Sequence, residues 1–81
     1  MDVTVRYFAA AADAASRESE VWTLGPDAQL DALRAQLIER YGEPMRRILS
    51  TGSFLVDGVV RRDGGPIGGT VVDVLPPFAG G

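Results

Sequence analysis

The sequence predicts an α+β domain in which a mixed β-sheet packs against one main helix. Several short segments are rich in β-branched and aromatic residues, as strands are, and one longer segment places apolar residues at helical spacing. A chain of 81 residues forms one domain and has no room for a second core. We expect this domain to cover residues 1–75 and residues 76–81 to form a flexible C-terminal tail.

The first predicted elements are two strands separated by an alanine-rich segment. Residues 3–8 alternate with a period of two, which predicts a strand with its odd-numbered residues buried. Residues 9–15 predict either a helical turn or a small-residue loop, because alanine favours helix but this run has no apolar stripe. Residues 20–24 predict a second strand, which Gly25-Pro26 ends.

The main helix is predicted at residues 28–41, where apolar residues form a stripe and charged residues lie mostly on the other side. Asp27 is the expected N-cap, because its carboxylate can accept hydrogen bonds from the first N–H groups of the helix. Gly42 and Pro44 end the helix.

The second half predicts a short turn of helix and a closing set of strands. Residues 45–49 predict the helical turn, and Asp57-Gly58 is a dipeptide typical of a tight hairpin turn between residues 54–56 and 59–60. The glycine-rich segment 64–69 predicts an irregular connection rather than a core element. Residues 70–75 are apolar nearly throughout, which predicts a central strand.

The predicted order is therefore strand, strand, helix, strand, short strand, strand. An early hairpin, a helix that crosses it and a last strand that pairs with the first form a mixed sheet with one covered face. This is the β-grasp arrangement.

Composition excludes the common routes of catalysis. The chain has no cysteine and no histidine, so it offers no disulfide, thiolate nucleophile or imidazole base. A Ser-His-Asp relay cannot form, and a metal site would depend on carboxylates alone. Self-contained catalysis is therefore not expected, and no bound cofactor or metal is predicted.

All eight basic residues are arginine, and the chain has no lysine. Two interpretations are open: biased codon usage, or protection of an activated acyl group from attack by side-chain amines. Composition favours the first. The pairs Arg46-Arg47 and Arg61-Arg62 are interpreted as solvated charge rather than as a binding patch. A net charge of −3 argues against a nucleic-acid partner, and no segment has the length and apolarity of a membrane span. The N-terminus lacks the pattern of a secretory signal, so we expect a cytoplasmic protein.

The most specific feature is the segment Pro76-Pro77-Phe78-Ala79-Gly80-Gly81. Two prolines end the preceding strand and favour polyproline II, in which six residues span on the order of 19 Å. The two glycines lack a Cβ, so the tail can enter a narrow channel in a partner. The alternative is that this segment is a frayed end of the chain without a role. We expect the tail to bind partner proteins through Leu75, Pro76, Pro77, Phe78, Ala79 and Gly80.

The expected reactive group is the carboxyl of Gly81. A terminal carboxyl has a pKa of about 3.5, so at neutral pH it is an anion and a poor electrophile. Conversion to an acyl-adenylate with ATP and Mg²⁺ makes its carbon open to attack, and a sulfur donor then leaves a thiocarboxylate. Because this chain lacks the residues for that activation, it needs an ATP-using partner.

These segments resemble the small, sulfur-carrying subunit of molybdopterin synthase, in the MoaD/ThiS family of ubiquitin-like proteins. The resemblance spans almost the whole chain. It rests on Val5-Arg6-Tyr7-Phe8-Ala9-Ala10, Leu30-Asp31-Ala32-Leu33-Arg34, Phe54-Leu55-Val56-Asp57-Gly58 and, most specifically, Leu75-Pro76-Pro77-Phe78-Ala79-Gly80-Gly81. The Pro-Pro-x-x-Gly-Gly ending favours the molybdopterin branch over the thiamine branch.

The resemblance implies three partners. An adenylating enzyme of the ubiquitin-activating type would load Gly81 with AMP, and a sulfurtransferase would supply the sulfur. The thiocarboxylated tail would then enter the large subunit of molybdopterin synthase and donate sulfur to cyclic pyranopterin monophosphate. Gly81 would carry the sulfur, Gly80 would admit it to the site, and Pro76, Pro77 and Phe78 would set reach and docking.

Three other functions stay open. The family often has an acidic turn where this chain has Gly68-Gly69-Thr70-Val71, which allows sulfur delivery to another pathway, such as thiamine, cysteine or a specialised metabolite. The Gly-Gly ending also allows a ubiquitin-like modifier joined to protein lysines. A docking domain with an inert tail is the last alternative.

Overall fold

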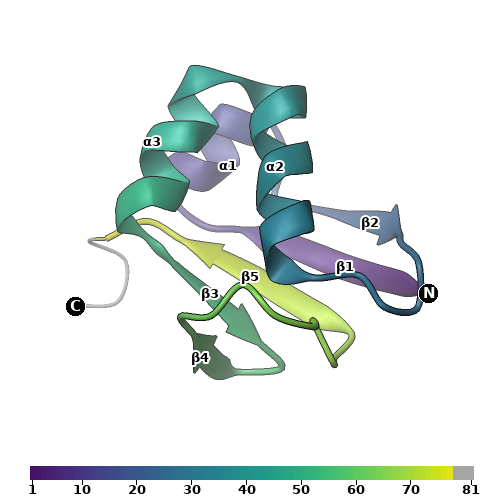
Figure 1. Cartoon of the computed structure of the whole chain (residues 1–81). Coiled ribbons are helices and arrows are strands. Elements are labelled where there is room, and N and C mark those ends of the chain that lie inside the picture. The colour runs from purple at the N-terminus through teal and green to yellow at the C-terminus, as the bar shows by residue number, and fades with distance from the viewer. Residues whose placement is uncertain (78–81) are drawn as a thin grey trace.

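The fold is built on a five-stranded mixed sheet. A computed structural model describes residues 1–77, and in that range the strand order is β2-β1-β5-β3-β4. Figure 1 shows the helices on one face of this sheet. The elements in chain order are β1 (Asp2–Tyr7), α1 (Ala10–Ala15), β2 (Ser19–Thr23), α2 (Leu30–Tyr41), α3 (Glu43–Thr51), β3 (Ser53–Val56), β4 (Val59–Arg61) and β5 (Val71–Leu75).

The pairing of the strands confirms the predicted topology. β1 pairs antiparallel with β2 and parallel with β5, which lies in the centre of the sheet and pairs antiparallel with β3. The hairpin between β3 and β4 turns at Asp57 and Gly58, whose φ angles of 48° and 83° are both positive, as the predicted tight turn requires. The chain therefore has the α+β, β-grasp arrangement that the order of elements predicted.

The core lies between the sheet and the helices. Alternate residues of each strand point toward the helices, because successive side chains of a strand face opposite sides of a sheet. Val3, Val5 and Tyr7 of β1 are buried, as predicted. They pack with apolar residues from the other elements, namely Ala11, Ala15, Leu24, Leu30, Leu33, Leu37, Met45, Leu49, Phe54, Val56, Ile67, Val72 and Val74.

The three helices of residues 1–77 refine the predictions from sequence. The alanine-rich segment forms the helix α1 rather than a loop. Glu43–Thr51 forms α3, which is longer than the predicted turn at 45–49 and has a proline in its first turn. None of these three helices has the length and apolarity needed to cross a bilayer.

The start of α2 differs from the prediction. The helix begins at Leu30 rather than at residue 28, Gln29 stands at the N-cap, and no side chain caps it, so the assignment of Asp27 is wrong. The first N–H groups of the helix instead donate to the carbonyls of Gly65 (2.9 Å) and Gly64 (3.2 Å). A loop distant in sequence therefore accepts the hydrogen bonds that a local N-cap side chain would have accepted.

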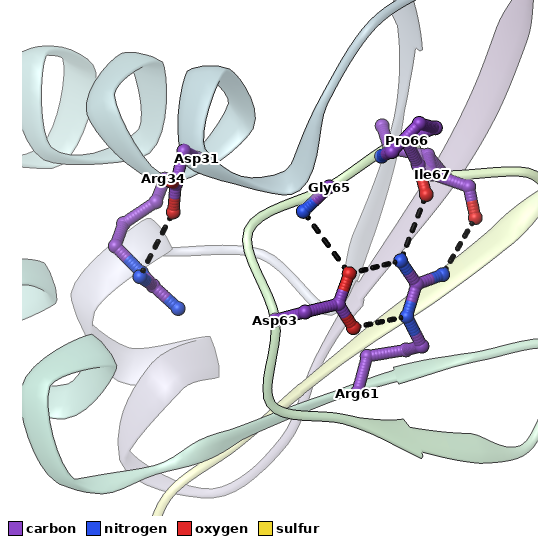
Figure 2. Close-up of polar contacts among 7 residues, drawn as sticks. All are labelled: Asp31, Arg34, Arg61, Asp63, Gly65, Pro66 and Ile67. Carbon is purple, nitrogen blue, oxygen red and sulfur yellow. Dashed lines mark hydrogen bonds and ion pairs between the residues drawn. The ribbon is translucent and has the colours of Figure 1, made fainter.

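That loop, residues 62–70, is irregular as predicted, but it does contribute to the core. Ile67 has no exposed surface, and its N–H donates to the carbonyl of Ala28 at 3.0 Å. Figure 2 shows how Arg61 holds the loop: its guanidinium pairs with Asp63 through two 2.7 Å contacts and donates to the carbonyls of Pro66 (2.8 Å) and Ile67 (3.0 Å). Arg61 is therefore a structural residue and not solvated charge.

A buried carboxylate joins α2 to the edge of the sheet. The side chain of Glu20 is only 7% exposed and accepts hydrogen bonds from the hydroxyls of Tyr7 (2.5 Å) and Tyr41. Arg17 and Arg40 lie within 3.0 and 3.5 Å of the same carboxylate. Burial raises the pKa of Glu20, but the hydrogen bonds from the tyrosines and the charge of Arg40 act together to hold the pKa below its ordinary value.

Candidate functional site

The candidate site is the point at which the chain leaves the sheet after β5. Leu75 is half-buried at the end of the strand, Pro76 is buried and Pro77 is exposed. Any projection of the tail from the domain therefore starts no earlier than Pro77. The other predicted tail residues, Phe78, Ala79, Gly80 and Gly81, lie outside the described residues.

The end of β5 is held closely by the junction between α3 and β3. A Cβ at Gly52 would collide with the carbonyl oxygen of Leu75 and with that of Ile48. The two backbones meet so closely because Ser53 is the register partner of Leu75 at the start of β3. Only a glycine fits at position 52. This glycine lets the start of β3 contact the last residue of β5, after which the tail begins.

Beside the tail lies the sheet surface opposite the helices, which we call the open face. Near the tail its residues are Leu55, Val60, Asp73 and Leu75, since they alternate with residues that point toward the helices. Val60 is 49% exposed, and Leu55 and Leu75 are half-buried. The open face thus presents apolar side chains next to the start of the tail, which is typical of a surface that a partner covers.

A groove of about 410 Å³ connects the open face to the tail. Residues of β3, β4 and β5 line it together with the end of α3, Arg62 and the two prolines. The lining residues are Thr51, Ser53, Leu55, Val60, Arg62, Leu75, Pro76 and Pro77. The structure therefore brings three of the predicted partner-binding residues, Leu75, Pro76 and Pro77, to one groove.

An ion pair lies on the open face between β1 and β5. Asp73 is only 5% exposed and is the register partner of Arg6, whose guanidinium donates to both carboxylate oxygens at 2.5 and 2.8 Å. The bonds to this carboxylate raise the pKa of Arg6. The same guanidinium lies 5.7 Å from the ring centre of Phe8. Sequence reasoning missed this pair, although a single aspartate in an otherwise apolar strand was a signal for a polar partner on the open face.

Most of the charged groups near the site pair with one another. In the part of the chain that the structure describes, no group of three or more carboxylates is placed to hold a metal ion. Arg46 and Arg47 pair with Glu43 on the exposed side of α3, as expected of solvated charge. What the arrangement provides is an apolar surface beside the point at which the tail leaves the sheet.

Comparison with solved structures finds 25 matching chains, and three of them illustrate the similarity. The Haloferax volcanii HVO 2177 protein, determined in solution, has a TM-score of 0.80 and 24% identity over 100% of this chain and 87% of that protein. SAMP1 from the same organism has a TM-score of 0.77 and 19% identity, with all of both chains covered. A second crystal structure, of H. volcanii small archaeal modifier protein 1, has a TM-score of 0.75 and 17% identity, covering 95% of this chain and 98% of that one.

At the level of sequence the result is different, because no family model and no curated protein matches the chain. All three structural matches have identities below 25%, so they establish the fold and not a shared activity. The fold is the ubiquitin-like β-grasp that the sequence predicted.

Proposed function

We propose that this chain is a sulfur carrier for molybdopterin synthesis and that the carboxyl group of Gly81 carries the sulfur. The observation that supports the proposal best is that the central strand β5 leads into Pro76 and Pro77, the first residues of the Pro-Pro-Phe-Ala-Gly-Gly segment, beside the apolar open face. A partner that covers the open face would receive the tail in its own active site. The ubiquitin-like fold and the resemblance of the tail to sulfur carriers are consistent with this role.

The proposed chemistry has two steps at one carbon atom. A carboxylate oxygen of Gly81 attacks the α-phosphorus of ATP held with Mg²⁺ by the adenylating partner, and pyrophosphate leaves. A hydrosulfide equivalent from a sulfurtransferase then attacks the acyl carbon, the bond to AMP breaks, and AMP leaves with its electron pair while one proton is released. The product is a thiocarboxylate, and neither step uses a side chain of this protein, which has no cysteine or histidine.

Two partners would recognise the same surface in turn. In this proposal an adenylating enzyme of the ubiquitin-activating type and the large subunit of molybdopterin synthase each cover Leu55, Val60 and Leu75. Pro76 and Pro77 would direct the tail into the partner, and Phe78, Ala79 and Gly80 would line its path. The second partner would transfer the sulfur to cyclic pyranopterin monophosphate and release the carboxylate.

The test is the intact mass of the full chain after incubation with ATP, Mg²⁺, an adenylating enzyme of this type and sulfide. We expect the gain that replacement of one oxygen by sulfur produces, and no gain when ATP is omitted. A variant that lacks Gly81 is the control for the position of the modification. If the mass does not change with any activating enzyme, the chain is not a sulfur carrier. Transfer to the pterin, in an assay with the large synthase subunit, separates the molybdopterin role from thiamine, cysteine or other sulfur pathways.

A second candidate function is attachment to protein lysines, as a ubiquitin-like modifier. It is favoured by the structural similarity to a protein named small archaeal modifier protein 1. The last basic residue of the chain is Arg62, so trypsin would leave residues 63–81 on a modified lysine. Mass spectrometry of cell lysates for lysines bearing this remnant tests the idea, and its absence in cells that make thiocarboxylated carrier would leave sulfur transfer as the function.

A further inference from the structure

A second groove of about 290 Å³ lies between the helices and the edge strand β4, and it shares Ser53 and Arg62 with the groove beside the tail. It is bordered by α2, the end of α3, the start of β3 and the end of β4, and its lining residues are Arg34, Leu49, Ser50, Gly52, Ser53, Phe54, Arg61 and Arg62. Every charged side chain in this lining is an arginine, although the whole chain has a net charge of −3. The groove is therefore a local concentration of positive charge on an acidic protein.

The three arginines differ in what already binds them. Arg61 is committed to Asp63 and to two loop carbonyls, so it contributes charge rather than free donors. Arg62 is exposed, and no ion pair or side-chain hydrogen bond joins it to any residue in the range 1–77. Arg62 is thus the arginine of the groove with the most N–H groups free to bind a ligand.

Arg34 on α2 also has unused capacity. Its one ion pair is a 3.3 Å contact with the exposed Asp31, which Figure 2 shows on the same helix. Its Nε is buried and has no hydrogen-bond partner among the described residues. The guanidinium lies 5.4 Å from the ring centre of Phe54, which holds it beside the groove. A buried donor without a partner calls for an explanation, and a bound anion drawing this guanidinium toward itself is one.

One feature of the groove opposes an anion. Leu49 and Ser50 belong to the last turn of α3, where a helix carries the equivalent of about half a negative charge. The three guanidinium groups carry three formal positive charges, and the carboxylates that balance two of them lie outside the lining. The potential in the groove therefore stays positive because of Arg62.

We propose that this groove binds an oxyanion of the phosphate class, held by Arg62 and Arg34 beside the backbone of Gly52 and Ser53. Guanidinium groups from two elements can each bind different oxygens of a tetrahedral anion, whereas a carboxylate has only two oxygens to share. The volume is near the lower limit of small-molecule sites, about 300 Å³, so it suits one phosphate group with its water. The phosphate is either free in solution or part of a nucleotide whose remaining atoms lie outside the groove. The anion groove shares Ser53 and Arg62 with the groove beside the tail, but the proposal does not depend on sulfur chemistry at Gly81.

The experiment is a titration of the ¹⁵N-labelled full chain followed by NMR, with sodium phosphate, sodium acetate and sodium chloride at equal ionic strength and pH 7. We expect saturable shifts with phosphate at the amides of Gly52 and Ser53 and at the Nε–H of Arg34. Two partly solvated charge-assisted contacts correspond to a dissociation constant on the order of 1 mM. A parallel titration with AMP distinguishes the sources: tighter binding than phosphate indicates a nucleotide, and equal binding indicates free phosphate.

Matched charge variants locate the site. Arg62→Gln should weaken phosphate binding about tenfold, which is the effect of losing one charge-assisted contact. Arg47→Gln removes the same charge from the far side of α3, where the side chain is 77% exposed, and should leave the binding unchanged. Both residues are exposed, so the fold is expected to persist, and the spectra themselves report it. Shifts that do not saturate, equal binding of acetate, or equal losses in both variants would overturn the proposal.

Discussion

The close approach of Gly52 to the end of β5 makes a sharp prediction about one methyl group. In Gly52→Ala the new Cβ would overlap the carbonyl oxygens of Leu75 and Ile48, and both are backbone atoms that cannot rotate away. The α3–β3 junction or the end of β5 has to move. Forcing an extra carbon into a packed site costs about 1–3 kcal/mol, so we expect the free energy of unfolding to fall by about that amount.

The magnitude can be read from the unfolding temperature and from urea unfolding. For a domain of this size, 1 kcal/mol shifts the melting temperature by about 4–8 °C, so Gly52→Ala should lower it by about 4–24 °C. Trp22 is the only tryptophan and is half-buried on β2, so its fluorescence reports unfolding away from the substitution. The amide resonances of Leu75 and Ser53 should shift as well, because these residues pair across the affected junction.

Gly25→Ala is the matched control. A Cβ at Gly25 meets nothing within 4 Å, so the same substitution there adds no overlap. It should raise the free energy of unfolding by about 0.4–1 kcal/mol, because alanine restricts the unfolded chain. If Gly52→Ala were as stable as the parent protein within about 0.5 kcal/mol, the range of ordinary surface substitutions, the close packing inferred at the start of the tail would be wrong.

Three further outcomes follow from the core, the buried carboxylate and the open face. Ile67→Ala should lower the free energy of unfolding by about 2–5 kcal/mol in urea titrations, whereas Val21→Ala at a 63% exposed site should change it by less than about 0.5 kcal/mol. A similar small loss at both sites would mean that the 62–70 loop does not pack on the core. The pKa of Glu20 is lowered in the folded state, so the stability that its charge contributes is present above the unfolded pKa of about 4.3 and is lost as the pH falls through the folded pKa. The difference in free energy of unfolding between the parent and Glu20→Gln should therefore shrink between pH 7 and pH 3. A constant difference would contradict this. Val60→Glu should reduce the conversion of Gly81 to the thiocarboxylate in the mass assay without loss of stability. Val21→Glu, on the same face at the other edge of the sheet, should leave this conversion intact. Equal conversion of both variants would exclude the open face as the docking surface.

The local elements were predictable because periodicity is a local property. Val3, Val5 and Tyr7 were expected to be buried from their alternation alone, and they are. The turn at Asp57-Gly58 was predictable because both positions need a positive φ, which this dipeptide tolerates. The glycine-ended tail, with its implied chemistry, was also evident from residue types and order, although its last four residues lie outside the described range and their role stays a prediction.

The errors have a common physical origin. Asp27 has the right chemistry for a helix cap, but the carbonyls of Gly64 and Gly65 occupy that place, and no local pattern reveals a partner more than thirty residues away. Ile67 was assigned to an irregular connection because glycines surround it, yet it fills the core. In both cases a loop without regular structure replaces what local signals suggested, because burial and hydrogen-bond demand are met by whatever backbone the fold brings near.

The sequence by itself determined the strands and the main helix, the buried face of the first strand, the lack of cysteine and histidine and the residue types of the tail, since these depend on residue chemistry and short-range spacing. Only the tertiary structure decided the registers in which β5 pairs with β1 and with β3, which place Arg6 on Asp73 across 67 positions and set Leu75 against Gly52. The open face beside the tail and the arginine groove next to it also exist only after those pairings. The reason is that pairings between distant segments are selected by the packing of the whole core, which offsets the entropy of closing long loops, and no short window of sequence contains that information.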